Sequence, residues 1–158
     1  MKNKIVTITG ATSGIGWATA LAFKKIGAKL IICGRRDEKL RKLCGILGNN
    51  TQILKFDVRD KKAVFEAFNS LPESWKDIEI LVNNAGNAHG LDPVQSASID
   101  DWDAMIDSNV KGLMYVTKAV LPKMIESKKG HIINLGSIAG KEVYPSGNVY
   151  CSSKAAVD

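Results

Sequence analysis

Apolar residues gather in five short runs along the chain, all rich in Ile, Leu and Val. These runs cover residues 4–9, 29–33, 52–56, 78–82 and 130–135. None of them alternates cleanly between apolar and polar side chains, a pattern typical of strands buried on both faces of a sheet. Because stretches with helical spacing separate the runs, the pattern predicts an α/β fold with a parallel sheet and right-handed crossovers.

The segments between the runs show apolar residues at helical spacing. A first helix is expected after residue 14. Its apolar stripe would consist of Ile15, Ala18, Thr19, Ala22 and Ile26. A second helix is expected to begin at Asp37, which fits an N-cap. A third spans about 63–71 before Pro72, and a fourth runs from about 98 to 120 and ends before Pro122, because proline disfavours a helix interior.

Three glycines, Gly10, Gly14 and Gly16, connect the first strand to the first helix. Glycine lets a backbone turn tightly and approach a pyrophosphate, whose charge the N-terminus of the following helix favours. Thr12 and Ser13 add hydroxyl groups at the helix entrance. The spacing differs from the general G-x-G-x-x-G fingerprint, so by itself the motif indicates either a dinucleotide site or a plain structural turn.

Arg35 and Arg36 follow the second strand, about 20 residues after the glycines, where an acidic residue would bind an adenosine ribose. Guanidinium groups instead match a phosphate, so the pair predicts the 2′-phosphate of NADP, with plain solvation as the alternative. Asp57 follows the third strand. Its carboxylate is expected either to cap a helix or to accept a bond from the adenine amino group.

Amide side chains follow the fourth strand in the sequence Asn83-Asn84-Ala85-Gly86. Because ligands bind at the carboxyl ends of parallel strands, these residues indicate either cofactor contact or bracing of the sheet. Asn109 interrupts the apolar stripe of the fourth helix. A buried amide needs fixed hydrogen-bond partners, and a structural role explains Asn109 as well as a catalytic one. His89 lies in an irregular connection and is expected to be exposed.

Tyr150 and Lys154 are four residues apart in the start of a fifth helix, so they share one face. An ammonium group near a phenol favours the phenolate, which suits a general acid and base. Lys154 could also hold a ribose hydroxyl. Ser137 follows the fifth strand and could donate to a substrate oxygen. Taken alone, the Tyr-x-x-x-Lys spacing is common by chance and favours an ordinary helix face.

The composition is that of a globular protein, with 45% hydrophobic and 24% charged residues. The length of 158 residues suits a single domain over residues 1–158. The basic residues behind the net charge of +6 are spread over several helices, so no nucleic-acid partner is expected. No apolar run reaches the roughly 20 residues of a membrane span, and a cytoplasmic location is expected. Cys33, Cys44 and Cys151 lack metal or disulfide spacing, so we expect buried, reduced thiols and no metal.

Together these motifs resemble the short-chain dehydrogenase/reductase family over essentially the whole chain. The resemblance implies a Rossmann-like, doubly wound sheet of strand order 3-2-1-4-5 and hydride transfer between a nicotinamide and a substrate carbon. It implies that Tyr150 is the catalytic acid and base, that Ser137 orients the substrate, that Lys154 binds the ribose and tunes Tyr150, and that Asn109 supports a proton relay. It implies NADP contacts from Gly10, Ala11, Thr12, Ser13, Gly14, Ile15, Gly16, Arg35, Arg36, Asp57, Val58, Asn84, Ala85, Gly86, Tyr150 and Lys154.

Within the family, segments such as Gly34-Arg35-Arg36 and Gly147-Asn148-Val149-Tyr150 are similar to the NADP-dependent serine and 3-hydroxy acid dehydrogenases. A small hydroxy acid or ketone is therefore the expected substrate. The alternatives are a 3-oxoacyl thioester reductase and a non-catalytic dinucleotide-binding module. Family members continue past the fifth helix and form homodimers or homotetramers. We therefore expect these 158 residues to be C-terminally incomplete, to bind cofactor weakly and to turn over little substrate.

Overall fold

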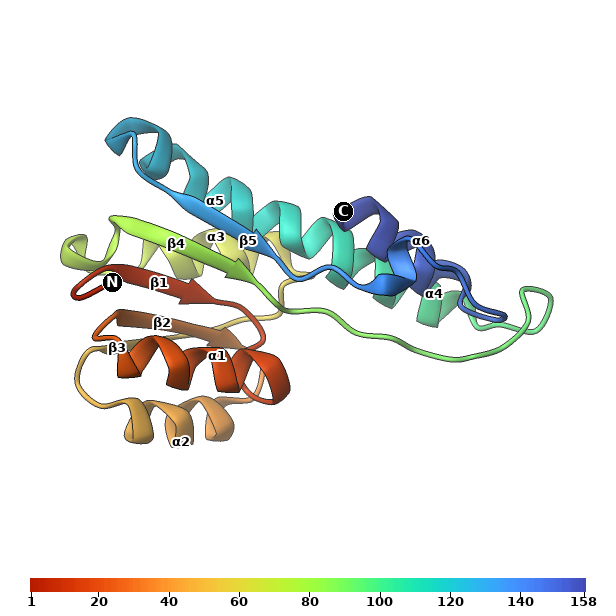
Figure 1. Cartoon of the computed structure of the whole chain (residues 1–158), viewed down its shortest axis with the longest axis horizontal. Coiled ribbons are helices and arrows are strands. Elements are labelled where there is room, and N and C mark those ends of the chain that lie inside the picture. The colour runs from red at the N-terminus through yellow and green to blue at the C-terminus, as the bar shows by residue number, and fades with distance from the viewer.

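The computed structural model covers residues 1–158 and joins the five strands in one parallel sheet (Figure 1). The strands are β1 (Ile5–Ile8), β2 (Lys29–Gly34), β3 (Thr51–Lys55), β4 (Ile78–Asn83) and β5 (His131–Asn134). Their order across the sheet is β3-β2-β1-β4-β5, and every neighbouring pair is parallel. This order confirms the Rossmann-like, doubly wound fold.

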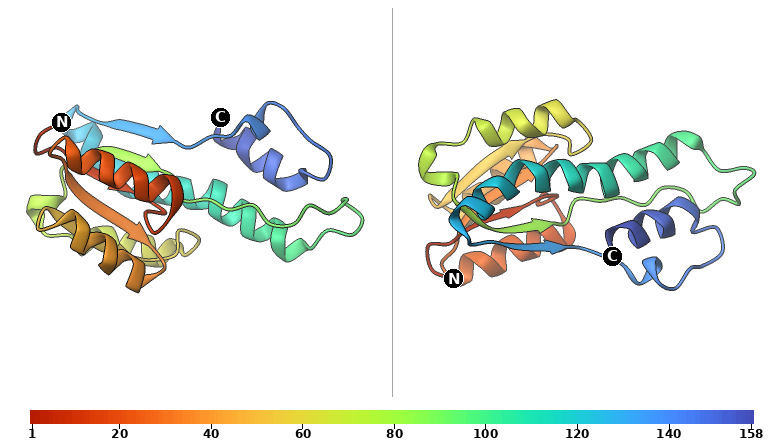
Figure 2. Two further views of the ribbon diagram at one scale, coloured as in Figure 1. Left: turned by 60° about the horizontal axis from the view of Figure 1, so that its bottom comes forward. Right: turned by 90° about the horizontal axis from the view of Figure 1, so that it is seen from above.

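Helices cover both faces of the sheet. They are α1 (Gly14–Lys25), α2 (Asp37–Leu47), α3 (Lys61–Asn69), α4 (Ile99–Ile106), α5 (Leu113–Ser127) and α6 (Asn148–Val157). Two short 3₁₀ turns, η1 (Glu73–Trp75) and η3 (Ile138–Gly140), and a π-helical turn, η2 (Asp107–Gly112), complete the elements. One face carries α1 and α2, and the opposite face carries α3 and α5 (Figures 1 and 2).

Each face of the sheet has its own apolar core. Ile8 and Leu30 pack toward α1 and α2, while Ile31 and Leu81 pack toward α3 and α5. Neighbouring strand residues thus serve opposite cores, which explains why β1, β2 and β4 lack apolar and polar alternation. β5 differs: Ile132 packs against the α3 and α5 core, but Ile133 is 39% exposed on the other side. The α1 and α2 layer therefore leaves β5 uncovered.

The expected apolar stripe of α1 was wrong. Ile15 and Ile26 are 61% and 50% exposed, whereas Gly16 and Ala20 are the buried residues of the helix. The reason is close approach to the turn after β1, because a methyl group at Gly16 would lie 2.5 Å from the carbonyl oxygen of Gly10. Contact at this range selects the smallest side chains, which a count of large apolar residues overlooks.

The expected single helix over 98–120 was also wrong in two respects. It divides into α4, η2 and α5, and α5 continues through Pro122 to Ser127. A proline inside a helix costs about 3 kcal/mol. Burial of Met124, two residues after Pro122, offsets this cost by roughly 1.5–3 kcal/mol. The helix ends at Ser127, where the following Lys128 adopts a left-handed backbone with φ +53°.

Two expected helix caps differ from the structure. Asp37 is the first residue of α2 rather than its N-cap, and its carboxylate accepts a bond of 2.6 Å from Arg41. Asp57 caps no helix, because Asp60 accepts the bond from the Ala63 N–H at the start of α3. Asp57 is thereby free to engage other groups.

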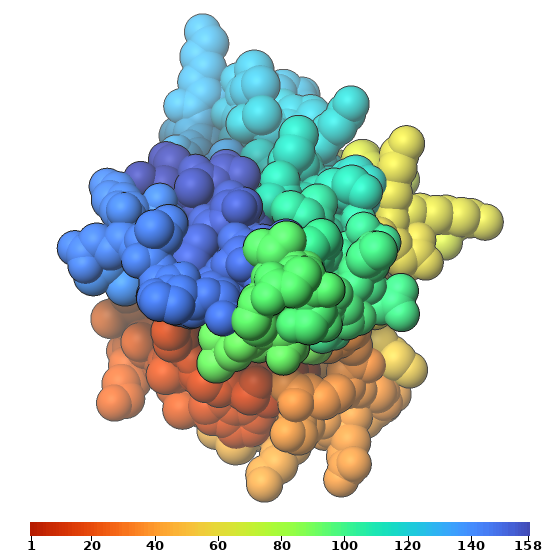
Figure 3. All heavy atoms as spheres, turned by 90° about the vertical axis from the view of Figure 1, so that its right-hand side faces the viewer, coloured from red at the N-terminus to blue at the C-terminus, as the bar shows by residue number.

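The segments that carry the remaining predicted site residues lie beyond the carboxyl ends of the strands. The connection after β4 runs outward to α4, and η3 and α6 lie beside it (Figures 1 and 2). Figure 3 views this end of the molecule, where residues near 90 contact the segment that leads into α6. A bond of 2.7 Å from the Asn148 side chain to the carbonyl oxygen of Asp92 joins the two segments.

None of the helices is both long and apolar enough to cross a membrane.

Candidate cofactor-binding and catalytic site

The glycine turn between β1 and α1 depends on glycine at two positions. Gly10 and Gly14 adopt φ angles of +64° and +53°, in the left-handed region that favours glycine. A methyl group at Gly10 would also lie 2.9 Å from the Cα atom of Ala85. The Ser13 side chain does not cap α1, and the first turn of α1 carries no acidic residue. The N–H groups of this turn are therefore available to an anion.

The residues after β4 brace the glycine turn. The Asn84 side chain donates to the carbonyl oxygens of Thr9 and Gly10, at 2.8 and 3.2 Å. The backbone N–H groups of Asn84 and Ala85 both donate to the Thr9 hydroxyl at 3.0 Å. Asn83 ties β4 to Thr117 and Asn134. Of the two roles expected for this motif, bracing is the one that the side-chain amides perform.

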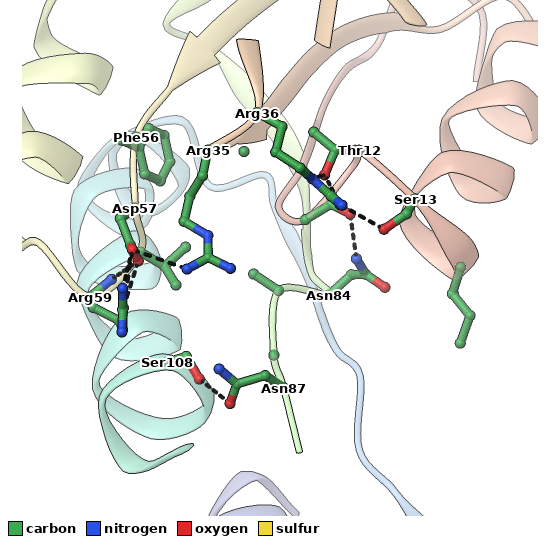
Figure 4. A pocket seen from close by; sticks show the side chains of 16 residues that line it. Thr12, Ser13, Arg35, Arg36, Phe56, Asp57, Arg59, Asn84, Asn87 and Ser108 are labelled. Atoms are coloured by element: carbon green, nitrogen blue, oxygen red, sulfur yellow. Dashed lines mark hydrogen bonds and ion pairs between the residues drawn. The ribbon is translucent and has the colours of Figure 1, made fainter. Parts of the chain in front are cut away.

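A cavity of about 270 Å³ opens beside this turn, at the carboxyl ends of β1, β2, β3 and β4 (Figure 4). Eleven of its lining residues were expected to bind cofactor: Gly10, Thr12, Ser13, Ile15, Arg35, Arg36, Asp57, Val58, Asn84, Ala85 and Gly86. Three further predicted residues, Ala11, Gly14 and Gly16, shape the turn without lining the cavity. The lining also includes residues that sequence reasoning missed, which are Gly34, Phe56, Arg59, Asn87 and Ser108.

The two arginines after β2 point to different parts of the cavity wall. Arg36 donates from Nε to the Thr12 hydroxyl at 3.1 Å and from Nη2 to the Ser13 hydroxyl at 2.9 Å. Arg35 reaches toward Asp57, with its Nη1 3.4 Å from a carboxylate oxygen (Figure 4). Two guanidinium groups and two hydroxyls therefore line one side of the cavity, a donor set that suits a phosphate.

Asp57 is held mainly by Arg59. The Arg59 backbone N–H and Nε donate to one carboxylate oxygen at 3.0 and 3.1 Å, and Nη2 donates to the other at 2.7 Å. Partial burial alone would raise the pKa of Asp57. The bonds from Arg59, together with the charges of Arg59 and Arg35, outweigh burial and lower this pKa. The Asp57 carboxylate is therefore ionised at neutral pH.

Asn109 is 2% exposed and has fixed partners, as expected. Its side-chain oxygen accepts from the Asn87 N–H at 2.8 Å and from the Ser108 hydroxyl at 2.9 Å. Its Nδ2 donates to the Asn87 carbonyl oxygen at 2.9 Å and to the Ser153 hydroxyl at 3.0 Å. These bonds connect η2 to the β4 connection and to α6, the helix of Tyr150 and Lys154.

The Lys154 side chain is largely buried and points to the carboxyl ends of the strands. Its Nζ donates to the carbonyl oxygen of Leu135, just after β5, at 2.8 Å. A methyl group at Gly86 would lie 3.8 Å from this Nζ and 3.1 Å from the Asn109 side-chain oxygen. The ammonium and the amide therefore converge on Gly86 at the edge of the cavity. Burial lowers the pKa of Lys154 below its usual range.

Tyr150 and Ser137 lie outside the cavity lining, on neighbouring elements. Ser137 caps η3 by accepting from the Ala139 N–H at 3.2 Å. η3 packs closely on α6, because a methyl group at Gly140 would lie 2.8 Å from the carbonyl carbon of Lys154. The structure thus brings the segments of Ser137, Tyr150 and Lys154 together, and their catalytic roles stay predictions.

Comparison with known proteins decides the family. The family described as short chain dehydrogenase matches residues 4–158. The chain belongs to this family. The chain is 52% identical over 153 residues to the NADP-dependent 3-hydroxy acid dehydrogenase YdfG of Salmonella typhi, covering 97% of this chain and 62% of that protein. It is 48% identical over 156 residues to sulfoacetaldehyde reductase 2 of Chromohalobacter salexigens, with 97% and 62% covered.

Solved structures of other dehydrogenases are similar to nearly the whole chain. The closed form of serine dehydrogenase complexed with NADP⁺ has a TM-score of 0.94 and 51% identity, over 96% of this chain and 61% of that one. NAD⁺-bound xylitol dehydrogenase has a TM-score of 0.93 and 31% identity, over 99% and 61%. These findings confirm the predicted family. This short-chain dehydrogenase chain spans about 62% of the length of the curated relatives it matches.

Besides Gly34 and Phe56, four polar residues of this short-chain dehydrogenase site were missed because their signals are weak in the sequence. Arg59 follows Asp57 by two residues, and it is one of many basic residues spread along the chain. Ser108, Asn87 and Ser153 are small polar residues without a chemical motif. Their positions are the only signal that could have drawn attention to them. Asn87 comes directly after the motif that follows β4, and Ser108 and Ser153 are next to predicted site residues.

Proposed function

We propose that this chain is the cofactor-binding part, with the catalytic residues, of an NADP-dependent oxidoreductase that acts on a small hydroxy acid or ketone. The observation that carries the proposal is the wall of the cavity. There, Arg35 and Arg36 lie with the Thr12 and Ser13 hydroxyls beside the uncapped start of α1. Such a donor set matches the phosphates of NADP, and the chain is similar to an enzyme solved with NADP⁺.

When bound, NADP supplies the nicotinamide carbon that accepts or donates the hydride. We infer that the chain's own residues handle the proton. Tyr150 exchanges a proton with the substrate oxygen, and Ser137 donates a hydrogen bond that orients this oxygen. Lys154 lies one turn after Tyr150 in α6, and its Nζ holds a ribose hydroxyl. Asn109 fixes α6 against η2 through Ser153, which keeps this group aligned with the cavity.

The first test measures cofactor binding by the 158-residue chain itself, through the fluorescence of NADPH and NADH. A 2′-phosphate bound by two guanidinium groups should make NADPH binding about 10- to 100-fold tighter. Equal affinity for the two cofactors would refute the assignment of NADP.

The second test measures turnover in a chimera that joins this chain to the C-terminal part of serine dehydrogenase from Escherichia coli, which is 51% identical over the shared region. Tyr150→Phe should lower turnover at least about a hundredfold while NADPH still binds. Tyr115→Phe removes the same hydroxyl from α5 and serves as the matched control. Full turnover by Tyr150→Phe would favour a non-catalytic role for this residue. A panel of 3-hydroxy acids, serine and a 3-oxoacyl thioester would separate the substrate classes.

We infer that the complete protein is a cytoplasmic homodimer or homotetramer. Supporting this inference, Met114, Leu121 and Ile125 form an apolar stripe on the outer side of α5, with 61%, 36% and 66% of each residue exposed. An apolar stripe of this kind is typical of a surface that another copy covers. Sedimentation of the chimera as a monomer would contradict the inference.

A further inference from the structure

A negative charge occupies the wall of the cavity where we place the adenosine end of NADP. Asp57 lies at the carboxyl end of β3, and its carboxylate lines the cavity together with Arg35 and Arg36 (Figure 4). A carboxylate near a 2′-phosphate disfavours binding in two ways, because it repels the phosphate and competes for the same guanidinium groups. A site that prefers NADP therefore has to neutralise Asp57.

Two arginines contact this carboxylate, but unequally. Arg59 donates to Asp57 Oδ2 from Nε at 3.0 Å and from Nη2 at 2.7 Å, and its Nε also reaches Oδ1 at 3.1 Å. The two nitrogens form a fork that matches the carboxylate. Arg35 makes one contact of 3.4 Å to the same oxygen, and its side chain is 62% exposed. Arg59 is the principal partner of Asp57, so Arg35 is only loosely engaged and can turn toward a ligand.

The position of Arg59 suits this role. It is two residues after Asp57, and its backbone N–H also bonds the carboxylate, so the pair is held by local geometry. Asp107 is the other acidic group near Arg59. It already accepts a bond of 2.7 Å from Lys111, which leaves the Arg59 fork to Asp57.

We propose that Arg59 is a specificity-determining residue for NADP over NAD, because it neutralises Asp57 and keeps Arg35 available for the 2′-phosphate. The inference rests on the proposed function, in which the adenosine part of NADP lies in this cavity. Without Arg59, Asp57 would draw Arg35 into a full ion pair. The cavity would then lose the positive charge of Arg59, and Arg35 would no longer be available to the 2′-phosphate.

The test compares 2′,5′-ADP with 5′-AMP, which share the adenosine and differ by the 2′-phosphate alone. Calorimetry on the 158-residue chain gives the ratio of the two dissociation constants. Arg59→Gln should reduce the preference for 2′,5′-ADP about tenfold and change 5′-AMP binding much less. Arg59→Lys retains the charge and should keep most of the preference. Lys123→Gln removes an equally charged, ion-paired group from the far end of α5 and serves as the matched control.

A second variant separates neutralisation from a purely structural role. Asp57→Asn combined with Arg59→Gln leaves no carboxylate to engage Arg35, so the ratio should recover to within about threefold of the original value. An unchanged ratio in Arg59→Gln would overturn the proposal. So would an equal loss of both ligands, which indicates distortion of the loop, or a double variant no better than Arg59→Gln. If the unsubstituted chain itself showed no preference for 2′,5′-ADP, the proposed function would fail instead.

Discussion

Replacing Asn109 with alanine tests whether its hydrogen bonds stabilise the fold around the site. Asn109 is 2% exposed and makes four side-chain hydrogen bonds to Asn87, Ser108 and Ser153. Ser108 and Ser153 keep other partners, the carbonyl oxygens of Ala104 and Tyr150. The substitution therefore leaves the N–H and carbonyl groups of half-buried Asn87 without these partners, and each unpaired group costs up to about 1–3 kcal/mol. We expect the free energy of unfolding to fall by about 2–4 kcal/mol.

Urea unfolding followed by tryptophan fluorescence measures this change, since Trp75 is buried and Trp17 and Trp102 are half-buried. Asn50→Ala is the matched control, because Asn50 is exposed in the turn before β3. The control should stay within about 0.5 kcal/mol of the original chain. If Asn109→Ala also changed the free energy of unfolding by less than about 0.5 kcal/mol, the network would be a minor contributor to stability. The case for Asn109 would then rest on catalysis alone.

Two further predictions concern buried groups. Burial lowers the pKa of Lys154, so the unfolded chain binds more protons at this residue than the folded chain does. The free energy of unfolding should therefore rise with pH in the window below the ordinary pKa of 10.5, when it is compared with that of Lys154→Met. Parallel pH profiles for the two chains would contradict this. Cys33 and Cys151 are buried and burial raises the pKa of the Cys33 thiol, whereas Cys44 is half-buried. A thiol reagent should therefore modify Cys44 first. In the Cys44→Ser variant, the fast phase of this reaction should be absent. Fast reaction of Cys33 would be inconsistent with the packing.

The structure explains why residue 86 is a glycine. Gly86 faces both the Asn109 oxygen and the Lys154 ammonium, at 3.1 and 3.8 Å from the position of a methyl group. A side chain there would separate these groups from the cavity. The sequence predicted Gly86 as a cofactor contact, but the convergence of η2 and α6 on it comes from elements far apart in the chain.

Much of the fold was predictable because the decisive patterns are local. Each strand was recognised from its own run of apolar residues, and parallel pairing followed from the helices between them. The glycine turn was recognised in the same way, since its φ angles depend on a few neighbouring residues. The stripe of α1 was mispredicted because its buried positions depend on how closely the helix approaches Gly10 and Asn84.

Local patterns in the sequence were enough to predict the strands, the glycine turn and the types of side chain at the carboxyl ends of the sheet. The tertiary structure alone decided which of those groups meet. Asn109 bonds to residues 22 and 44 positions away, at Asn87 and Ser153. Arg59 and Asp57 are neighbours in the sequence, yet the effect of their ion pair on Arg35 depends on how β2 lies beside β3. Charges and hydrogen bonds act over a few ångströms in space, and spacing along the chain does not report those distances.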